Sequence, residues 1–258
     1  MPFLTSDDGA EIYYEVQGNG PRTLAFAPGF MGITDIWRAQ IDRFSADYRC
    51  VAFDNRGAGR SEKPFPRIAY GVQRHAADLH AVLSEVGADQ VVIVGHSMGG
   101  NTASLYYLSH PEAVAGIVYC GSYVSGAQIA GVGNTLEAIK GAVKHKASRV
   151  EFYKAVGLSE AIAMESAKWE LYAVLGNAES FMEFDLSDRI GDISCPCLIL
   201  HGDGDIVSPL DPCGVGLRDG LPDSQLEVFS GVNHCPMSED PEQTNSLIAR
   251  FLDERIKW

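Results

Sequence analysis

The chain has 258 residues, enough to bury one full hydrophobic core, and open α/β sheets of this size often form one domain with a smaller insertion. It carries 20 Lys and Arg against 34 Asp and Glu, and this net charge of −14 argues against nucleic acid or an anionic membrane surface as a partner. No apolar run approaches the length of a membrane span, and the polar, acidic start lacks the features of a secretory signal, so we expect a cytoplasmic protein.

The alternation of elements predicts a mostly parallel, eight-stranded sheet with helices on both faces. Asp8-Gly9 is a strong hairpin signal between two short apolar runs, so the chain is expected to open with two antiparallel strands. The predicted strands are 3–5, 11–16, 23–27, 49–53, 91–94, 114–120, 196–201 and 226–229. Helical spacing of apolar residues occurs between most of them, at 36–44, 72–86, 98–109 and 240–255.

One interval breaks this alternation, because no strand run occurs between Tyr123 and about Ser187. Such a length is too great for a loop. We expect a helical cap at 124–187, inserted between the sixth and seventh core strands, with residues 1–123 and 188–258 forming the core. Its predicted helices are 135–147, 149–156, 160–175 and 178–188.

A β-branched run, Val91 to Val94, leads into Gly95-His96-Ser97-Met98-Gly99 and then into a predicted helix. Glycine on both sides of Ser97 allows a sharp strand-to-helix turn that exposes the hydroxyl above the sheet edge. The amide of Met98 then faces the oxygen of a group that Ser97 attacks. Ser97 is therefore the candidate nucleophile.

A serine nucleophile needs a base, and the base needs a third group to orient it. His234 lies in a predicted loop after the last strand, at the same edge of the sheet as Ser97. Two carboxylates follow the seventh strand, Asp203 and Asp205. We favour Asp205 as the acid because it lies further round the turn, whereas Asp203 is better placed to hold the loop backbone.

Five motifs in this order resemble those of the α/β-hydrolase superfamily. They are the oxyanion-type loop Pro28-Gly29-Phe30, the Asp-x-Arg-Gly-x-Gly-x-Ser turn at 54–61, the serine turn at 95–100, the Gly-Asp-x-Asp turn at 202–209 and the His-x4-Glu-Asp-Pro stretch at 234–241. The resemblance implies an oxyanion hole made by the backbone amides of Phe30 and Met98. The chain departs from the family in having Pro28 where His is usual and Asn233 where Gly is usual.

The resemblance implies a serine hydrolase that forms an acyl-enzyme on a carboxylic ester or lactone. A serine at the turn argues against epoxide hydrolases and haloalkane dehalogenases of this fold, which have an aspartate there. Carbon–carbon bond hydrolysis and cofactor-free haloperoxidase or perhydrolase activity stay open. A small-molecule receptor with little turnover also remains possible, because fold alone does not fix function.

Aromatic and large apolar residues are expected to line a pocket for a medium-sized, largely apolar substrate. The candidates are Phe30 and Met31 from the core, and Tyr123, Phe152, Trp169 and Tyr172 at or within the cap. We expect no cofactor and no metal site, because the six cysteines lack metal-ligand spacing. The expected partner is a small-molecule substrate, with no nucleic acid, and the chain is expected to be a monomer or homodimer.

Several residues near these motifs have simpler expected roles. We expect the His96 side chain to point away from the attacking edge, and Arg56 to hold loop carbonyls. Cys235 is expected to be a packed thiol. Glu239 and Asp240 are expected to favour the start of the last helix.

Overall fold

A computed structural model describes residues 2–30 and 32–258 and contains one eight-stranded sheet, in the order β1-β2-β4-β3-β5-β6-β7-β8. β1 pairs with β2 and β2 with β4 in antiparallel fashion, whereas every other pairing is parallel. This confirms the predicted mostly parallel sheet. The strands are β1 (Phe3–Thr5), β2 (Glu11–Gln17), β3 (Thr23–Ala27), β4 (Arg49–Phe53), β5 (Val91–His96), β6 (Val114–Cys120), β7 (Cys197–Gly202) and β8 (Ser224–Phe229).

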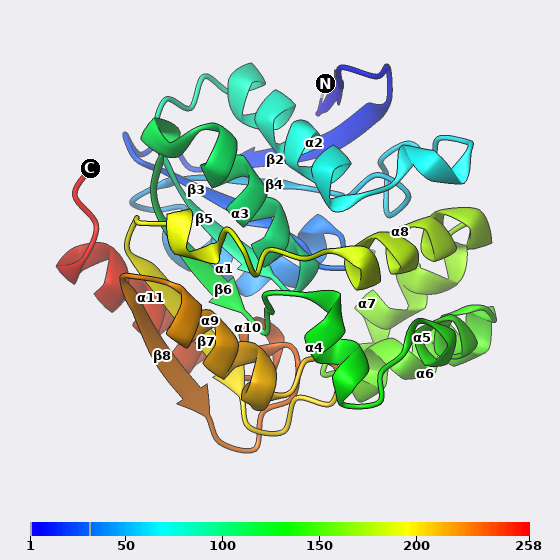
Figure 1. The fold of residues 1–258 in the computed structure, drawn as a ribbon. Coiled ribbons are helices and arrows are strands. Elements are labelled where there is room, and N and C mark those ends of the chain that lie inside the picture. The colour runs from blue at the N-terminus through cyan, green and yellow to red at the C-terminus, as the bar shows by residue number, and fades with distance from the viewer. Residues whose placement is uncertain (1, 31) are drawn as a thin grey trace.

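Helices cover both faces of this sheet (Figure 1). Successive residues of the central strand β5 serve opposite faces, as a pleated strand requires: Val91 and Ile93 pack in one hydrophobic cluster, Val92 and Val94 in the other. α2 and α3 contribute to the first cluster, and α1 and α11 to the second. The core helices are α1 (Arg38–Phe44), α2 (Val72–Glu85), α3 (Met98–Ser109), α9 (Val215–Gly220), α10 (Pro236–Glu239) and α11 (Pro241–Glu254).

The segment between β6 and β7 is helical, and Figure 1 shows its helices gathered at one side of the sheet. The expected single helix over 160–175 is wrong. Its first part ends near Glu165, a short 3-10 turn follows, and Trp169 and Glu170 adopt extended backbone before the next helix starts at Leu171. The helices are α4 (Gly126–Gly131), α5 (Leu136–Val143), α6 (Lys146–Ala155), α7 (Glu160–Glu165) and α8 (Leu171–Glu183).

Three short helices were not expected from the sequence: α4, α9 and α10. Each has only four to six residues, too few for a repeating apolar stripe to stand out. α10 is nevertheless important for the site, since it starts at Pro236, two residues after His234.

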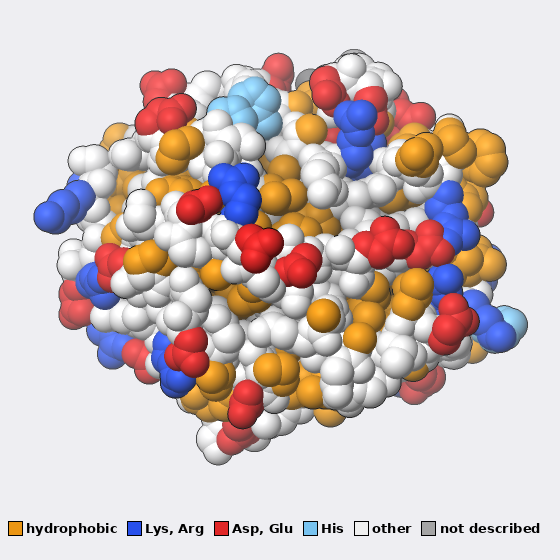
Figure 2. Space-filling view, in the orientation of Figure 1, with side chains coloured by type: hydrophobic (Ala, Val, Ile, Leu, Met, Phe, Trp, Pro, Cys, Tyr) orange, Lys and Arg blue, Asp and Glu red, His pale blue; other side chains and the backbone are white. Residues whose placement is uncertain are grey.

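The acidic excess of the sequence does not gather on the face drawn in Figure 2, where acidic and basic side chains are interspersed with small apolar groups. None of the helices within residues 2–30 and 32–258 combines the length and apolar character needed to cross a membrane.

Candidate active site

Ser97 stands at the turn between β5 and α3 in a strained backbone conformation. Its φ of 51° makes it the one non-glycine residue with positive φ in the described part of the chain. Such a conformation persists only where surrounding contacts impose it. Here the Ser97 N–H donates to the carbonyl of Cys120 at 2.8 Å, and the Ser122 hydroxyl donates to the carbonyl of Ser97 at 2.9 Å.

The two glycines beside Ser97 are required by close backbone approach. A Cβ atom on Gly99 would lie 2.0 Å from the carbonyl oxygen of Ala27, at the end of β3. One on Gly95 would lie 2.6 Å from the backbone nitrogen of Gly100. The chain can therefore turn tightly enough to present Ser97 at the sheet edge only with glycine at both positions.

His234 and Asp205 come together at the same edge from the two loops that follow β8 and β7. His234 Nδ1 lies 2.8 Å from Asp205 Oδ2, and both residues are about 95% buried. An ionised carboxylate accepts hydrogen bonds, so this contact places the proton on Nδ1 and leaves Nε2 as the nitrogen that can accept one. Ser97 and His234 line the same cavity.

The Asp205 carboxylate is surrounded by donors. Its Oδ1 accepts the backbone N–H groups of Val207 and Ser208 at 2.8 and 2.9 Å, and its Oδ2 lies 3.4 Å from Nε2 of the buried His201. Burial alone would raise the pKa of Asp205, but the interactions with His234 and His201 outweigh it and hold the pKa well below its usual range. The acid is therefore ionised at neutral pH.

Asp203 has a different position. Its Oδ1 accepts the backbone N–H of Gly231 at 2.7 Å, so its side chain joins the β7 and β8 loops. This is the backbone-holding contact expected for Asp203.

The loop after β3 carries Phe30, and its carbonyl groups are held by two side chains. Asn55 Nδ2 donates to the carbonyls of Gly29 at 2.8 Å and Pro28 at 3.2 Å. The Tyr153 hydroxyl, on α6, donates to the carbonyl of Phe30 at 3.0 Å. These contacts fix the peptide planes of the loop next to Ser97.

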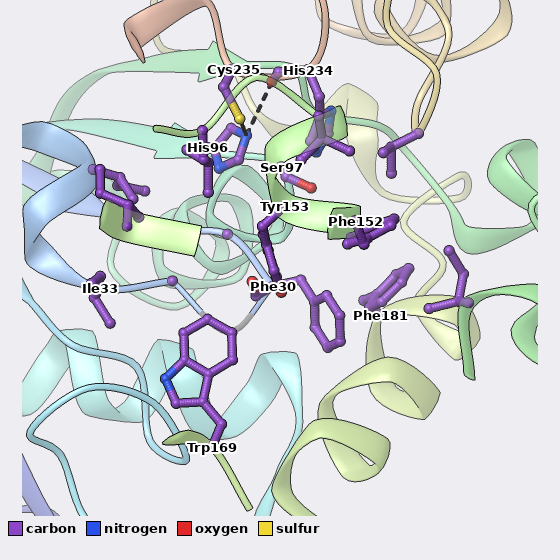
Figure 3. Close-up of a pocket in the computed structure, with 18 of the residues that line it drawn as sticks. Phe30, Ile33, His96, Ser97, Phe152, Tyr153, Trp169, Phe181, His234 and Cys235 are labelled. Carbon is purple, nitrogen blue, oxygen red and sulfur yellow. Dashed lines mark hydrogen bonds between the residues drawn. The ribbon is translucent and has the colours of Figure 1, made fainter. Parts of the chain in front are cut away.

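An apolar cavity lies between the sheet edge and the inserted helices (Figure 3). In Figure 3, His96, Ser97 and His234 lie together on one side of Phe30, and Trp169 lies on its opposite side. No carboxylate, ammonium or guanidinium group belongs to the described residues that line it. The lining residues are Gly29, Phe30, Gly32, Ile33, Ile36, His96, Ser97, Ile129, Ile139, Phe152, Tyr153, Val156, Leu158, Ile162, Trp169, Phe181, Val207, His234 and Cys235.

Three of the six residues expected to line the pocket do so, namely Phe30, Phe152 and Trp169. Tyr123 does not; its ring packs against Phe181, which does line the cavity, with the two ring centroids 6.5 Å apart. Met31 lies outside the described residues.

Tyr172 does not line the cavity either. Its hydroxyl donates to the carbonyl of Lys63 at 2.7 Å, and its ring packs edge-on against Phe65. The side chain is therefore used to attach α8 to the loop after β4.

His96 does not point away from the site, contrary to expectation. Its ring lines the cavity, lies 4.8 Å from the ring of His234, and its Nε2 lies 3.1 Å from the carbonyl oxygen of His234. Burial, with repulsion from His234 as the second cause, lowers the pKa of His96 to about 3, so the ring is neutral. Cys235 Sγ lies 3.7 Å from His96 Nε2, and burial raises the pKa of this thiol well above its usual value.

Sequence reasoning did not single out Ser208 or Gly121. The Ser208 hydroxyl lies 3.0 Å from Asp205 Oδ2 and 3.3 Å from His234 Nδ1, and it donates to the carbonyl of Gly121 at 2.8 Å. A Cβ on Gly121 would lie 2.6 Å from the carbonyl oxygen of His234. The sequence signal for Ser208 is only its place three residues after the acid, which many turns share.

Among the described residues, no group of three or more His, Cys, Asp or Glu side chains is arranged to hold a metal ion. The polar side chains among the residues that line the cavity belong to Ser97, His96, His234, Cys235, Tyr153 and Trp169.

Known proteins share this architecture along almost the whole chain. The non-heme haloperoxidase of Rhodococcus erythropolis is 27% identical, and the match covers 98% of this chain and all of the relative. The crystal structure of a bromoperoxidase from Bacillus anthracis matches with a TM-score of 0.87 at 23% identity, over 98% of this chain and all of that one. Est816, described as an N-acyl homoserine lactone degrading enzyme, matches with a TM-score of 0.80 at 27% identity, over 97% of this chain and all of that one.

Other similar proteins are named as esterases, an enol-lactonase and a 2-hydroxy-6-oxononadienedioate hydrolase. The named activities differ, so they support hydrolase activity in general and leave the substrate undetermined. A family model for the alpha/beta hydrolase fold matches residues 22–241. Since this match spans most of the chain, the protein belongs to the α/β-hydrolase fold family.

Proposed function

We propose that this protein is a serine hydrolase that cleaves carboxylic esters or lactones of medium-sized, largely apolar substrates through an acyl-enzyme. The observation that carries the proposal is the 2.8 Å contact between His234 Nδ1 and Asp205, beside Ser97 at one side of an uncharged cavity. Nucleophile, base and acid in this relation are the requirement for activating a serine hydroxyl.

In the first half of the proposed reaction, His234 Nε2 takes the proton of Ser97 as the serine oxygen attacks the carbonyl carbon. The carbonyl oxygen becomes negative and accepts hydrogen bonds from the amides of Phe30 and Met98. The C–O bond to the alcohol then breaks, and His234 gives its proton to the leaving oxygen. The acyl group remains as an ester on Ser97.

In the second half, His234 removes a proton from water, which attacks the acyl carbon. The second tetrahedral intermediate collapses, Ser97 leaves with the proton from His234, and the carboxylic acid is released. Asp205 stays ionised throughout and stabilises the charge on His234, in agreement with its lowered pKa.

The uncharged lining supports the substrate class. An acyl group carrying a carboxylate would lose its hydration in this cavity without gaining a cationic partner, which is costly. We further propose that residues 124–187 act as a cap, because α6 and α8 supply Phe152, Tyr153 and Phe181 to the cavity wall. The cap then selects the substrate by shape.

A second candidate is perhydrolysis, favoured by the similarity to proteins named as haloperoxidases. Hydrogen peroxide would replace water as the attacking group on the same acyl-enzyme. The products would be a peracid and free Ser97, with no change in any other step.

The test is a panel of p-nitrophenyl esters of graded acyl length together with several lactones, assayed with the native protein and Ser97→Ala. We expect hydrolysis of apolar esters or lactones and its loss in Ser97→Ala. Full activity of Ser97→Ala would contradict the proposal. Tight binding of an apolar ester without turnover would favour a receptor, and halogenation of an indicator with a p-nitrophenyl ester, hydrogen peroxide and bromide would favour the perhydrolase.

A further inference from the structure

Asn233 precedes His234, and its side chain joins two other segments. Its Oδ1 accepts the backbone N–H of Ile206, in the acid loop, at 3.0 Å. Its Nδ2 donates to the carbonyl of Ala155 at 2.9 Å. A residue without a side-chain amide would make neither contact, so Asn233 itself provides the link.

The carbonyl that Asn233 binds is at the end of a helix that forms part of the cavity. Ala155 is the last residue of α6, and the last carbonyls of a helix lack partners within it. The backbone N–H groups of residues 156–158 donate to the three carbonyls that precede Ala155. Asn233 supplies the partner for Ala155 itself, so it caps α6 from the base loop.

Glu239, on α10, provides a second connection at the same place. Its two carboxylate oxygens accept the backbone N–H groups of Asn233 and Cys235, each at 2.9 Å, so they bracket His234. Of the two acids expected to favour the start of the last helix, Asp240 accepts the Gln243 N–H in its first turn at 3.0 Å, whereas the carboxylate of Glu239 binds the base loop. A Cβ on Gly157, just beyond α6, would lie 2.2 Å from Glu239 Oε1, so the end of α6 packs directly on this carboxylate.

α6 also contacts the substrate side of the site. Phe152 and Tyr153 line the cavity, and the Tyr153 hydroxyl donates to the carbonyl of Phe30. A molecule that fills the cavity therefore presses on the helix whose end is bound to Asn233.

We propose that Asn233 is a positioning residue, through which the alignment of His234 depends on the position of α6. This inference rests on the proposed serine-hydrolase function. With α6 in place, the base loop is held on both sides, by Asn233 on Ala155 and by Glu239 on Gly157. When α6 shifts, His234 loses this support while Ser97 and Asp205 keep their own contacts.

Two substitutions separate the links. Asn233→Asp keeps an oxygen that accepts from Ile206 but places a carboxylate against the Ala155 carbonyl, so it breaks only the contact to α6. Gly157→Ala places a methyl group against Glu239 Oε1, the oxygen that accepts the Cys235 N–H, so it disturbs the base loop through Glu239 and leaves the Asn233 side chain unchanged. The matched control is Ser180→Ala, which removes a 2.8 Å hydrogen bond from the Val72 N–H to α8, a link between the inserted helices and the core away from His234.

The first readout is hydrolysis of p-nitrophenyl hexanoate, with kcat taken from the plateau of the full pH–rate profile so that charge effects of the new carboxylate are not counted. We expect kcat of Asn233→Asp and Gly157→Ala to fall on the order of tenfold to a hundredfold, with KM changed far less, because a misplaced base slows chemistry. Ser180→Ala should keep the native kcat. A native kcat in Asn233→Asp, or an equal fall in Ser180→Ala, would overturn the inference.

The second readout is hydrogen exchange, which needs no turnover and remains usable if the variants are partly destabilised. In Asn233→Asp, exchange should rise together in residues 152–158 and 232–236. A rise in only one of these segments would contradict the coupling. If the native protein hydrolyses no ester yet both segments exchange together, the proposed function fails while the physical link stands.

Discussion

The side-chain nitrogen of Asn55 lies 2.8 Å from the carbonyl oxygen of Gly29, the residue before Phe30. In a planar trans peptide the carbonyl of one residue and the N–H of the next point in opposite directions. By holding the Gly29 carbonyl on one side, Asn55 therefore sets the direction of the Phe30 N–H on the other. That N–H is one of the two proposed oxyanion donors.

We expect Asn55→Ala to lower kcat for a p-nitrophenyl ester by roughly tenfold to a hundredfold with little change in KM, since an oxyanion donor acts mainly in the transition state. Asn245→Ala is the matched control, because Asn245 also donates to a backbone carbonyl, that of Ala39 at 3.2 Å, far from the site. The measurement is kcat and KM of the two variants in steady-state assays. Equal losses in both would show that Asn55 acts only on stability.

The acid is tested by changing each of the two candidates. Asp205→Asn keeps the shape but replaces the ionised acceptor of His234, so we expect kcat to fall roughly 10⁴-fold. Asp203→Asn should keep most of the native kcat, because its carboxylate contacts only the Gly231 amide among the loop contacts described above. A larger loss in Asp203→Asn than in Asp205→Asn would reverse the assignment.

The sequence predicts those features that depend on local pattern. All eight strands occur where short apolar runs lie, and the serine turn follows from two glycines that close packing requires. Ser97, Asp205 and His234 each follow a parallel strand, and this is enough to predict that they lie at one sheet edge, because the carboxyl ends of parallel strands meet there.

Features that depend on tertiary packing were missed. Tyr123 and Tyr172 have the residue type of pocket residues, but their neighbours Phe181 and Lys63 place them elsewhere. His96 directly precedes Ser97, and neighbouring side chains of a strand point to opposite faces, yet the His96 ring lines the cavity together with Ser97. Neither outcome can be read from spacing, since each depends on which segments meet.

Arg56 stabilises the fold and takes no part in the proposed reaction. Its fully buried guanidinium binds both oxygens of Asp78 at 2.6 and 2.7 Å, and also Asp8 at 2.7 Å and the carbonyl of Ala69 at 2.9 Å. Removing one partner of a buried ion pair leaves the other charges uncompensated.

We therefore expect Arg56→Met to lower the free energy of unfolding by about 3–5 kcal/mol, as measured by urea denaturation. Arg189→Met removes an exposed ion pair with Asp192 and should cost at most about 1 kcal/mol. The activity of the folded fraction of Arg56→Met should equal that of the native protein. A cost as small as that of Arg189→Met would contradict the role of Arg56 in the core.

Stability at acid pH should depend on His75, which joins α2 to α8. This ring is fully buried, its Nε2 lies 2.6 Å from Asn177 Oδ1, and its Nδ1 has no hydrogen-bond partner among the described residues. Burial lowers the pKa of His75 to about 4, although the nearby Asp78 favours the charged form, and Arg56 adds to the lowering.

Because this pKa lies below that of an unfolded histidine, near 6.5, the unfolded chain binds more protons between these two values. The contribution of His75 to stability is therefore complete above about pH 6.5 and falls as the pH drops toward 4. Between pH 7 and pH 5 we expect proton binding to His75 in the unfolded chain to lower the free energy of unfolding by about 2 kcal/mol. His75→Gln keeps a donor for Asn177 but does not titrate, so urea denaturation should show its stability falling less steeply over this range. Parallel pH curves for the native protein and the variant would show that some other group controls the loss at acid pH.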